Sequence, residues 1–446
     1  MGSTLILNAC VVNEGEQRTC DVLIKDGHIE AIGSDLQHEA ADRVIDASGL
    51  HLLPGMIDDQ VHFREPGLTH KGDIASESTA AVAGGITSYM EMPNVDPPTL
   101  NMDELGKKFA RASQRSVANY SFYLGASNHN IDQIRAVDPT RVCGVKVFMG
   151  ASTGNLLVDD PKALDLIFRD CPILIATHCE DSRMIDANAE RISAQYGGKV
   201  PVEMHPVIRD VDACYASSSM AVELAKKHGS NLHVLHLTTE KELALFTAGN
   251  LADKRITAEA CVHHLWFSDQ DYPERGNRIK CNPAVKALSD RDALREAVRN
   301  DVIDVIATDH APHLLSEKEQ PYMQAPAGLP LVEHALPMLL ELYQQGVFTL
   351  EQVVQKACHN PAIRYQVANR GFIREGYAAD LVLVDLNATQ QIQDGSVRYK
   401  CGWTPFTGER FRARICQTFV NGVEVFDGTQ VIANTEAAQA LSFNRR

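Results

Sequence analysis

The sequence predicts an α/β fold, a (β/α)8 TIM barrel with a small β-sandwich domain built from both termini. The first reason is that short, Val- and Ile-rich strands alternate with helix-like segments through the middle of the 446-residue chain, which is typical of a parallel sheet. The second is that eight such strands occur, the number that closes a barrel. The third is that both ends of the chain carry short alternating strands without helices between them, as antiparallel sheets do.

The predicted barrel domain comprises residues 54–373. A helix between two strands returns the chain to the same edge of the sheet, so successive strands run parallel. The clearest helical patterns are Ser76–Ala83, Asp103–Ala112, Ala216–Lys227 and Arg291–Arg299. In chain order, the candidate strands are Met56–His62, Ile86–Met92, Asn119–Leu124, Gly144–Met149, Ile173–His178, Leu232–Leu237, Ile256–Val262 and Ile303–Asp309.

The predicted β-sandwich domain comprises residues 1–53 together with residues 374–446. A turn at Asp26-Gly27 separates two of its apolar stretches, and this dipeptide favours a tight hairpin. We therefore expect small antiparallel strands from the two ends to assemble beside the barrel. The candidate strands are Leu5–Leu7, Val22–Ile24, His28–Ile32, Val44–Ile45 and residues 380–385 and 418–426.

The composition excludes several classes of partner and site. Lys and Arg total 42 against 58 Asp and Glu, a formal charge of −16, and no long basic run occurs, so we expect no nucleic-acid partner. The sequence has no apolar run long enough to span a bilayer and no secretion signal, so we expect a cytoplasmic protein that does not enter a membrane. The 11 cysteines are scattered and form no CxxC pair, which argues against a disulfide framework or a zinc ribbon.

Polar residues stand at the ends of five predicted strands, where barrel enzymes carry their reactive groups. Taken singly, each has an ordinary explanation, because a histidine at a strand end is often a hydrogen-bonded structural residue and a buried lysine can belong to an ion pair. Together at one rim they indicate a functional site. These residues are His62, Lys146, His178, His236 and Asp309.

This combination of side chains suits a metal centre. Imidazole and carboxylate are ligands of Zn²⁺, which lowers the pKa of a bound water to about 7. A lysine ammonium would repel the metal, whereas a lysine that has reacted with CO₂ is an anionic carbamate whose two oxygens can bridge two metal ions. The chain therefore carries the residue types of a one- or two-metal hydrolytic site.

Several motifs resemble the amidohydrolase superfamily and, within it, the dihydroorotases. The resemblance covers nearly the whole chain, and its most specific part is Ile306-Ala-Thr-Asp-His-Ala-Pro-His313 in the last predicted strand. It implies a metal-dependent cyclic amide hydrolase that acts on a small molecule as a homo-oligomer. The other matching motifs are Pro54-Gly-Met-Ile-Asp58, His62-Phe-Arg-Glu-Pro-Gly67, Met92-Pro-Asn94, Asn282-Pro283 and Gly376-Tyr-Ala-Ala-Asp-Leu-Val-Leu-Val384.

The resemblance also implies a role for each site residue. Asp309 would be both a metal ligand and the catalytic proton shuttle, while a metal-bound hydroxide attacks the ring carbonyl. One or two zinc ions per chain would be held by Asp309 with His62, His178, His236 and Lys146, the last as a carbamylated bridge. The substrate would be held by Arg64, Asn94, Asn282, His313 and the backbone of Ala327 and Gly328.

The implied reaction is the reversible hydrolysis of L-dihydroorotate to N-carbamoyl-L-aspartate in de novo pyrimidine biosynthesis. Arg64 favours this substrate, because a guanidinium binds a carboxylate bidentately, and dihydroorotate carries a carboxylate whereas neutral hydantoins do not. Two alternatives stay open. One is another cyclic amidohydrolase of the allantoinase or hydantoinase/dihydropyrimidinase type, and the other is a non-catalytic dihydroorotase-like scaffold protein.

Position 60 departs from the family pattern. The family has His-x-His at the end of the first strand, whereas this chain has Gln60-Val61-His62. An amide oxygen is a poor zinc ligand compared with imidazole, so we expect the more deeply bound metal to be held more weakly, replaced or absent. Asp58 and Asp59 are candidates to compensate, although Asp59 should face away from Gln60 if the strand is regular.

Overall fold

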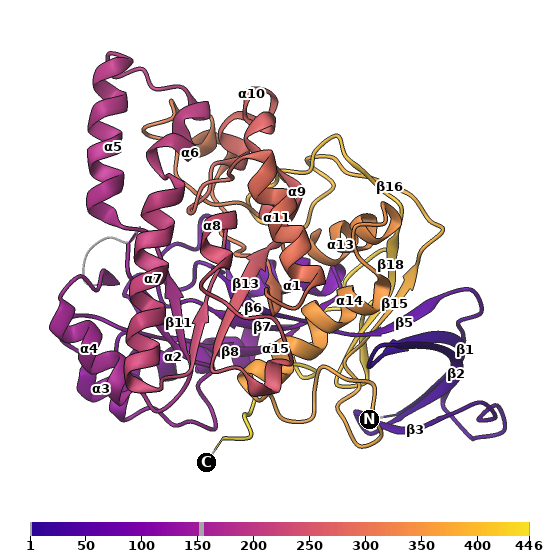
Figure 1. Ribbon diagram of the computed structural model, residues 1–446. Helices are drawn as coiled ribbons and strands as arrows, with labels where there is room; N and C mark the ends of the chain where they lie inside the picture. Colours follow the sequence, from indigo (N-terminus) through magenta and orange to yellow (C-terminus); the bar gives the residue numbers. More distant parts are fainter. Residues whose placement is uncertain (1, 151–155, 446) are drawn as a thin grey trace.

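The computed structural model describes residues 2–150 and 156–445. Figure 1 shows parallel strands in the middle of the molecule, helices around them, and a β-rich part on one side that contains the N-terminal strands. The predicted α/β barrel with a β-rich domain built from both termini is therefore confirmed.

The barrel is built from the eight strand positions that the sequence predicts. Neighbouring strands pair in parallel, from β6 to β8 and from β9 to β14. The third predicted strand is interrupted at Tyr123 and appears as β8 and β9, and a parallel bridge between Val61 and His310 joins the last strand position to the first. The strands are β6 (Met56–Val61), β7 (Ile86–Glu91), β8 (Asn119–Phe122), β9 (Leu124–Gly125), β10 (Val145–Phe148), β11 (Ile175–His178), β12 (Leu232–Val234), β13 (Ile256–Cys261) and β14 (Val305–Ala307).

Five of the longer helices begin where the sequence supplies a capping side chain. Asp73, Asn101, Asp160, Asp181 and Asp210 each accept a hydrogen bond from a backbone N–H in the first turn of the helix that follows, which satisfies a donor that the helix leaves free. All four helical patterns predicted from the sequence lie within α1, α2, α7 and α11. The helices are α1 (Ile74–Ala83), α2 (Met102–Arg115), α3 (Ile131–Arg135), α4 (Pro161–Asp170), α5 (Ser182–Gln195), α6 (His205–Ile208), α7 (Val211–His228), α8 (Glu240–Leu243), α9 (Val262–Trp266), α10 (Tyr272–Arg275), α11 (Leu288–Arg299), α12 (Leu315–Lys318), α13 (Ala335–Gln344), α14 (Leu350–Val354) and α15 (Asn360–Tyr365).

The β-rich domain combines strands from both ends of the chain. Its strands form one hydrogen-bonded sheet in the order β19-β18-β15-β5-β1-β2-β3, with β4 beside β1. Ile6, Val22, Leu52, Leu381 and Phe419 share one buried hydrophobic cluster, so neither end of the chain can form this core alone. The strands are β1 (Ser3–Asn13), β2 (Glu16–Lys25), β3 (His28–Gly33), β4 (Arg43–Asp46), β5 (His51–Pro54), β15 (Leu381–Asp385), β18 (Arg414–Val420) and β19 (Val423–Phe426), and a separate ribbon pairs β16 (Gln390–Gln391) with β17 (Arg410–Phe411).

Segments from the C-terminal part of the chain also pack on the barrel. Trp403 is fully buried, and its indole N–H donates a hydrogen bond to His313 O at 2.7 Å. Near the other end of the barrel, Leu441 N donates to Tyr120 O at 2.8 Å. The region after β15 thus contributes to the barrel as well as to the β-rich domain.

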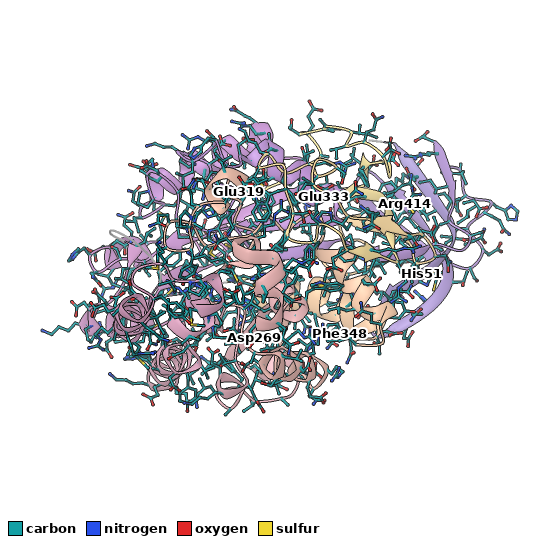
Figure 2. The ribbon with its side chains drawn as sticks, turned by 90° about the horizontal axis from the view of Figure 1, so that it is seen from above. His51, Asp269, Glu319, Glu333, Phe348 and Arg414 are labelled. Carbon is teal, nitrogen blue, oxygen red and sulfur yellow. The ribbon has the colours of Figure 1, made fainter. Side chains whose placement is uncertain are left out.

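The two parts of the molecule sit side by side. In Figure 2, which looks from above, Asp269 and Glu319 lie on the barrel and His51 and Arg414 lie in the β-rich domain. The segments that follow β11 and β13 carry α5, α6 and α10, which gather at the top of Figure 1. Within residues 2–150 and 156–445, no helix has the length and apolar character needed to cross a membrane.

Candidate active site

A cavity of about 210 Å³ lies at the carboxyl ends of the barrel strands. Side chains from successive strands converge at this end of a TIM barrel. Gln60, Phe148 and Ala311 form part of its lining. All the residues that the sequence predicts to bind metal or substrate line the same cavity, namely His62, Arg64, Asn94, Lys146, His178, His236, Asn282, Asp309, His313, Ala327 and Gly328.

His178 and His236 converge within the cavity. His178 ends β11, and its Nδ1 lies 3.0 Å from Nε2 of His236, which follows β12. The other ring nitrogen of His178, Nε2, donates to Glu180 Oε2 at 2.9 Å, and Arg209 donates to the same oxygen. Burial alone would raise the pKa of Glu180, but Arg209 and His178 outweigh it and lower the pKa to about 2. The ionised Glu180 therefore fixes the ring proton on Nε2 and leaves the Nδ1 lone pair facing His236.

His62 and Asp309 form a second convergent pair. His62 Nδ1 donates to Asn94 Oδ1 at 2.7 Å, which leaves Nε2 facing Asp309 Oδ1 at 2.9 Å. Gln60 Nε2 donates to the same Asp309 oxygen at 2.9 Å. Burial lowers the pKa of His62, as it does for His178 and His236. The three rings are therefore neutral near pH 7 and offer lone pairs.

Lys146 lies in β10 with only 1% of its surface exposed. Its Nζ makes no hydrogen bond with any described residue and lies 4.7 Å from the ring centroid of Phe148. Burial lowers the pKa of Lys146 to about 8, so it contains more neutral amine at a given pH than an exposed lysine does. The neutral amine is the form that can react with CO₂.

One part of the cavity is positively charged. Arg64 is 7% exposed, its Nε donates to Pro312 O at 3.1 Å, and its Nη2 lies 3.1 Å from His313 Nε2. Lys71 Nζ donates to His313 Nδ1 at 3.0 Å. Burial first, and then the charges of Arg64, Lys71 and Lys318, hold the pKa of His313 well below its usual range. This part of the cavity therefore suits an anion.

Asn282 and the loop around Gly328 supply the remaining polar surface. Asn282 Oδ1 is buried without a hydrogen-bond partner among the described residues, so it is free to accept one from a ligand. Gly328 has a φ of +141°, and an added Cβ would lie 2.5 Å from Ala311 O, so a side chain cannot be placed there without a shift. Lys318 Nζ donates to the carbonyls of Pro326 and Gly328 and holds this loop in place.

The chain matches known proteins over most of its length. Residues 51–425 match the Amidohydrolase family. The chain belongs to this family. The amidohydrolase is 33% identical over 431 residues to a dihydroorotase of Halobacterium salinarum, covering 96% of this chain and 98% of the relative. It is 30% identical over 444 residues to an allantoinase of Solibacter usitatus, covering 97% and 95%. The structure of an L-hydantoinase (dihydropyrimidinase) from Arthrobacter aurescens has a TM-score of 0.94 at 27% identity and covers 99% of this chain and 100% of that one.

The donor set of this amidohydrolase fits a divalent metal. His178 with His236, and His62 with Asp309, each bring two candidate ligand atoms within 3.0 Å of each other. His236 Nδ1 is buried without a hydrogen-bond partner among the described residues. Neutral imidazole and carboxylate are the nitrogen and oxygen ligands that zinc takes in proteins. The chemistry of these residues therefore fits a divalent metal at the rim.

Some residues that shape the site of the amidohydrolase were not predicted from the sequence. Glu180 and Arg209 orient His178. Lys71 adds positive charge near Arg64, whereas burial lowers the pKa of Lys318 to about 7. The role of Glu180 could have been predicted from the sequence, because it follows the strand-end His178 by two residues. A carboxylate so close to a metal-binding histidine can hold the ring in one tautomer. Neither Lys71 nor Lys318 could be predicted, because neither stands at the end of a barrel strand.

The two aspartates before Gln60 do not replace the missing imidazole. Strand β6 is irregular between Asp58 and Val61, and neither aspartate lines the cavity. Asp58 accepts hydrogen bonds from Thr308 N at 3.1 Å and from its Oγ1 at 2.6 Å. Asp59 lies instead beside His233 in the barrel interior. The suggestion that either one compensates at the rim is therefore wrong.

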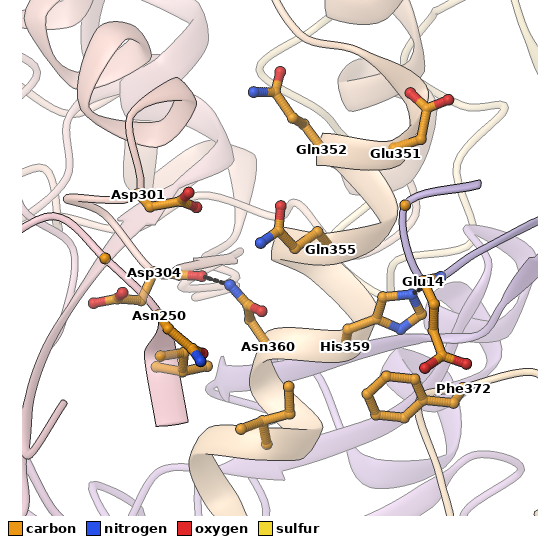
Figure 3. Close-up of a pocket in the computed structure, with 14 residues that line it drawn as sticks. Glu14, Asn250, Asp301, Asp304, Glu351, Gln352, Gln355, His359, Asn360 and Phe372 are labelled. Carbon is orange, nitrogen blue, oxygen red and sulfur yellow. Dashed lines mark hydrogen bonds between the residues drawn. The ribbon is translucent and has the colours of Figure 1, made fainter. Parts of the chain in front are cut away.

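A larger pocket, of about 360 Å³, lies at the opposite end of the barrel (Figure 3). Asp301 and Asp304, which line it, precede β14, so they mark the amino ends of the strands. Asp301 pairs with Lys356 and Asp304 with Lys254, so these carboxylates already have cationic partners. Figure 3 also shows Asn360 Nδ2 donating to Asp304 O. Because this end of a TIM barrel serves stability, we assign the chemistry to the rim cavity.

Proposed function

We propose that this amidohydrolase is a dihydroorotase, which reversibly hydrolyses L-dihydroorotate to N-carbamoyl-L-aspartate in de novo pyrimidine biosynthesis. The observation that carries the proposal is the position of Arg64, with Lys71 and Lys318 nearby, in the cavity that also contains the histidines. A buried guanidinium is stabilised by a paired anion. The carboxylate of dihydroorotate would supply that anion in a bidentate geometry.

The proposal includes one or two zinc ions at the rim. His62 and Asp309 would bind one, His178 and His236 the other, and a carbamate on Lys146 would bridge them. Once bound, zinc polarises a carbonyl oxygen and lowers the pKa of a bound water to about 7. The neutral Lys146 amine would form the carbamate by attacking CO₂, with an N–C bond formed and one proton released.

Asp309 would move the proton during hydrolysis. Its carboxylate would accept a proton from the attacking water and deliver it to the ring nitrogen as the amide bond breaks. Gln60 Nε2 donates to Asp309 Oδ1 and would hold the carboxylate in one orientation while the proton moves. This assigns to Asp309 the roles of ligand and general base, and then of general acid.

The remaining lining residues would orient the substrate. Arg64 and His313 would bind its carboxylate, and the unpartnered Asn282 Oδ1 would accept a hydrogen bond from a ring N–H. The backbone of Ala327 and Gly328 would lie against the ring. Asn94, whose Oδ1 accepts a hydrogen bond from His62, would act through that ring as well as through the substrate.

A substrate comparison tests the proposal. The purified, zinc-loaded protein should hydrolyse L-dihydroorotate with a kcat/KM at least tenfold above its values for hydantoin and allantoin. A preference for hydantoin or allantoin would replace the dihydroorotase assignment with that of another cyclic amidohydrolase. No turnover of any of the three would favour a non-catalytic scaffold.

Two variants test the mechanism within that assay. Lys146→Ala and Asp309→Ala should abolish turnover, because one removes the bridge and the other removes the proton shuttle. Circular dichroism and the melting temperature should show that both variants remain folded. A near-normal rate in either folded variant would refute the mechanism.

We also propose that the protein works in the cytoplasm. All 11 cysteines are free thiols and most of them are buried, which fits a reducing compartment. Cell fractionation tests the location. Light scattering of the purified protein tests the expected homo-oligomer.

A further inference from the structure

Three ionisable side chains meet inside the barrel outside the rim cavity. Asp59 of β6, His233 of β12 and Glu259 of β13 are all 0% exposed. His233 Nε2 lies 3.3 Å from Asp59 Oδ2 and 3.5 Å from Glu259 Oε2. Neither Asp59 carboxylate oxygen, nor Glu259 Oε2, nor His233 Nε2 makes a hydrogen bond with any described residue. The site therefore contains four buried polar atoms close to one another without a hydrogen bond among them.

The position of the ring protons of His233 decides what faces the two carboxylates. His233 Nδ1 lies 2.7 Å from Thr257 Oγ1, and the Thr257 hydroxyl donates to Leu232 O at 3.2 Å. Because the threonine proton points to that carbonyl, Nδ1 carries a ring proton, and Nε2 is the ring atom that faces the two carboxylates. Burial would lower the pKa of His233, but the carboxylates of Asp59 and Glu259 outweigh it and raise the pKa. The site therefore requires a positive charge, which either a proton on Nε2 or a bound cation supplies.

The spacing of these atoms fits a metal ion better than a shared proton. A hydrogen bond between nitrogen and oxygen spans about 2.7–3.2 Å, and both distances from His233 Nε2 exceed it. Zinc binds nitrogen and oxygen at about 2.0–2.2 Å in a tetrahedral geometry, which places neighbouring ligand atoms about 3.3–3.5 Å apart. The two distances from His233 Nε2, 3.3 and 3.5 Å, fall in this range.

We propose that Asp59, His233 and Glu259 bind a divalent cation, zinc by their ligand chemistry, at a site inside the barrel that is separate from the rim. Asp59 precedes His62 in the chain by three residues, and His233 precedes His236 by three, so both lie nearer the amino ends of their strands than the rim histidines do. Glu259 connects the two levels, because its Oε1 accepts a hydrogen bond from His236 N at 3.0 Å. The bound cation would neutralise the two carboxylates and tie β6, β12 and β13 together.

Crystallography tests this site without any variant. Anomalous difference maps from zinc-loaded crystals, collected on both sides of the zinc edge, should contain a peak within coordination distance of Asp59, His233 and Glu259. The peak should be distinct from any peak at His178 or His62. Crystals that bind zinc at the rim but have no peak at the interior cluster would overturn the proposal. This readout does not depend on which substrate the enzyme uses.

Metal analysis of variants gives a second test. Mass spectrometry of the metal content should find that Asp59→Asn loses one equivalent per chain and retains the rim metal. His178→Asn should lose rim metal and retain the interior equivalent. Asp58→Asn is the matched control, because Asp58 is equally buried but is hydrogen-bonded to Thr308, and it should retain both. Equal metal content in Asp59→Asn and the wild type would refute the site.

Discussion

Replacing Arg64 by methionine should separate recognition of the substrate carboxylate from the chemistry at the rim. Arg64 is 7% exposed, and burial lowers its pKa only to about 10, so the guanidinium is charged at neutral pH. Its Nε is occupied by Pro312 O and its Nη2 contacts His313, while its Nη1 has no partner among the described residues. Methionine has a similar length and keeps the packing but removes the charge and every donor.

The size of the effect follows from these contacts. A hydrogen bond to a charged group contributes about 1.5–3 kcal/mol, which corresponds to a loss of about 10- to 150-fold in kcat/KM. The methyl ester of dihydroorotate has the same ring without the charge. Arg64→Met should therefore change kcat/KM for the ester by less than about threefold, because the interaction that it removes is with the carboxylate.

The assay is steady-state hydrolysis of the acid and the ester by the wild type, Arg64→Met and Lys71→Met. Lys71 is the matched control, since it is a cation that contacts His313 rather than the open cavity and pairs with Glu317. Its loss should lower kcat/KM for the acid by less than about tenfold. Equal losses on acid and ester in Arg64→Met would refute the assignment of Arg64 to the carboxylate.

Three further results are expected. Glu180→Gln should weaken metal binding at the rim by about 10- to 100-fold, measured by chelator competition, because His178 loses its anionic acceptor; unchanged affinity would contradict that role. Recovery of metal-stripped enzyme at constant dissolved CO₂ should rise through pH 8 and level off above about pH 9, because the pKa of Lys146 is about 8 and only the neutral amine reacts. Recovery that is independent of CO₂, or flat between about pH 7 and pH 9, would exclude carbamylation. Gln60→His should increase the metal retained after dialysis, because it adds an imidazole beside Asp309. An unaltered metal content would show that position 60 does not face the metal.

The barrel and its rim could be predicted because their signals are local in the sequence. Each strand is an apolar run of a few residues, and helix caps such as Asp73 and Asp210 stand directly before the helices that they start. The candidate ligands His178 and Asp309 stand at or just beyond the ends of apolar strands, where the polarity changes. Parallel strands bring such ends to one rim, so the cavity follows from the fold class.

The arrangement around Asp59 could not be predicted, because it depends on register and on a local irregularity. A regular strand would have turned Asp59 and Gln60 to opposite faces, but β6 is irregular between Asp58 and Val61. Cys261 Sγ contacts both Gln60 Oε1, at 3.8 Å, and Glu259 Oε1, at 3.5 Å. Gln60 of β6 and Glu259 of β13, the second carboxylate of the cluster around Asp59, therefore approach the same thiol.

The geometry of Gln60 also limits what its substitution can do to the proposed metal centre. With a carbamate on Lys146, His178 and His236 give one metal three protein ligands, and His62 and Asp309 give the other three as well. Three protein ligands with an open position is the usual set of a catalytic zinc, so the loss of one imidazole leaves both positions usable. The Gln60 amide donates to Asp309 Oδ1 and occupies one lone pair of that oxygen. We therefore expect weaker retention at the position of His62 and Asp309, rather than the loss of activity that a scaffold protein would show.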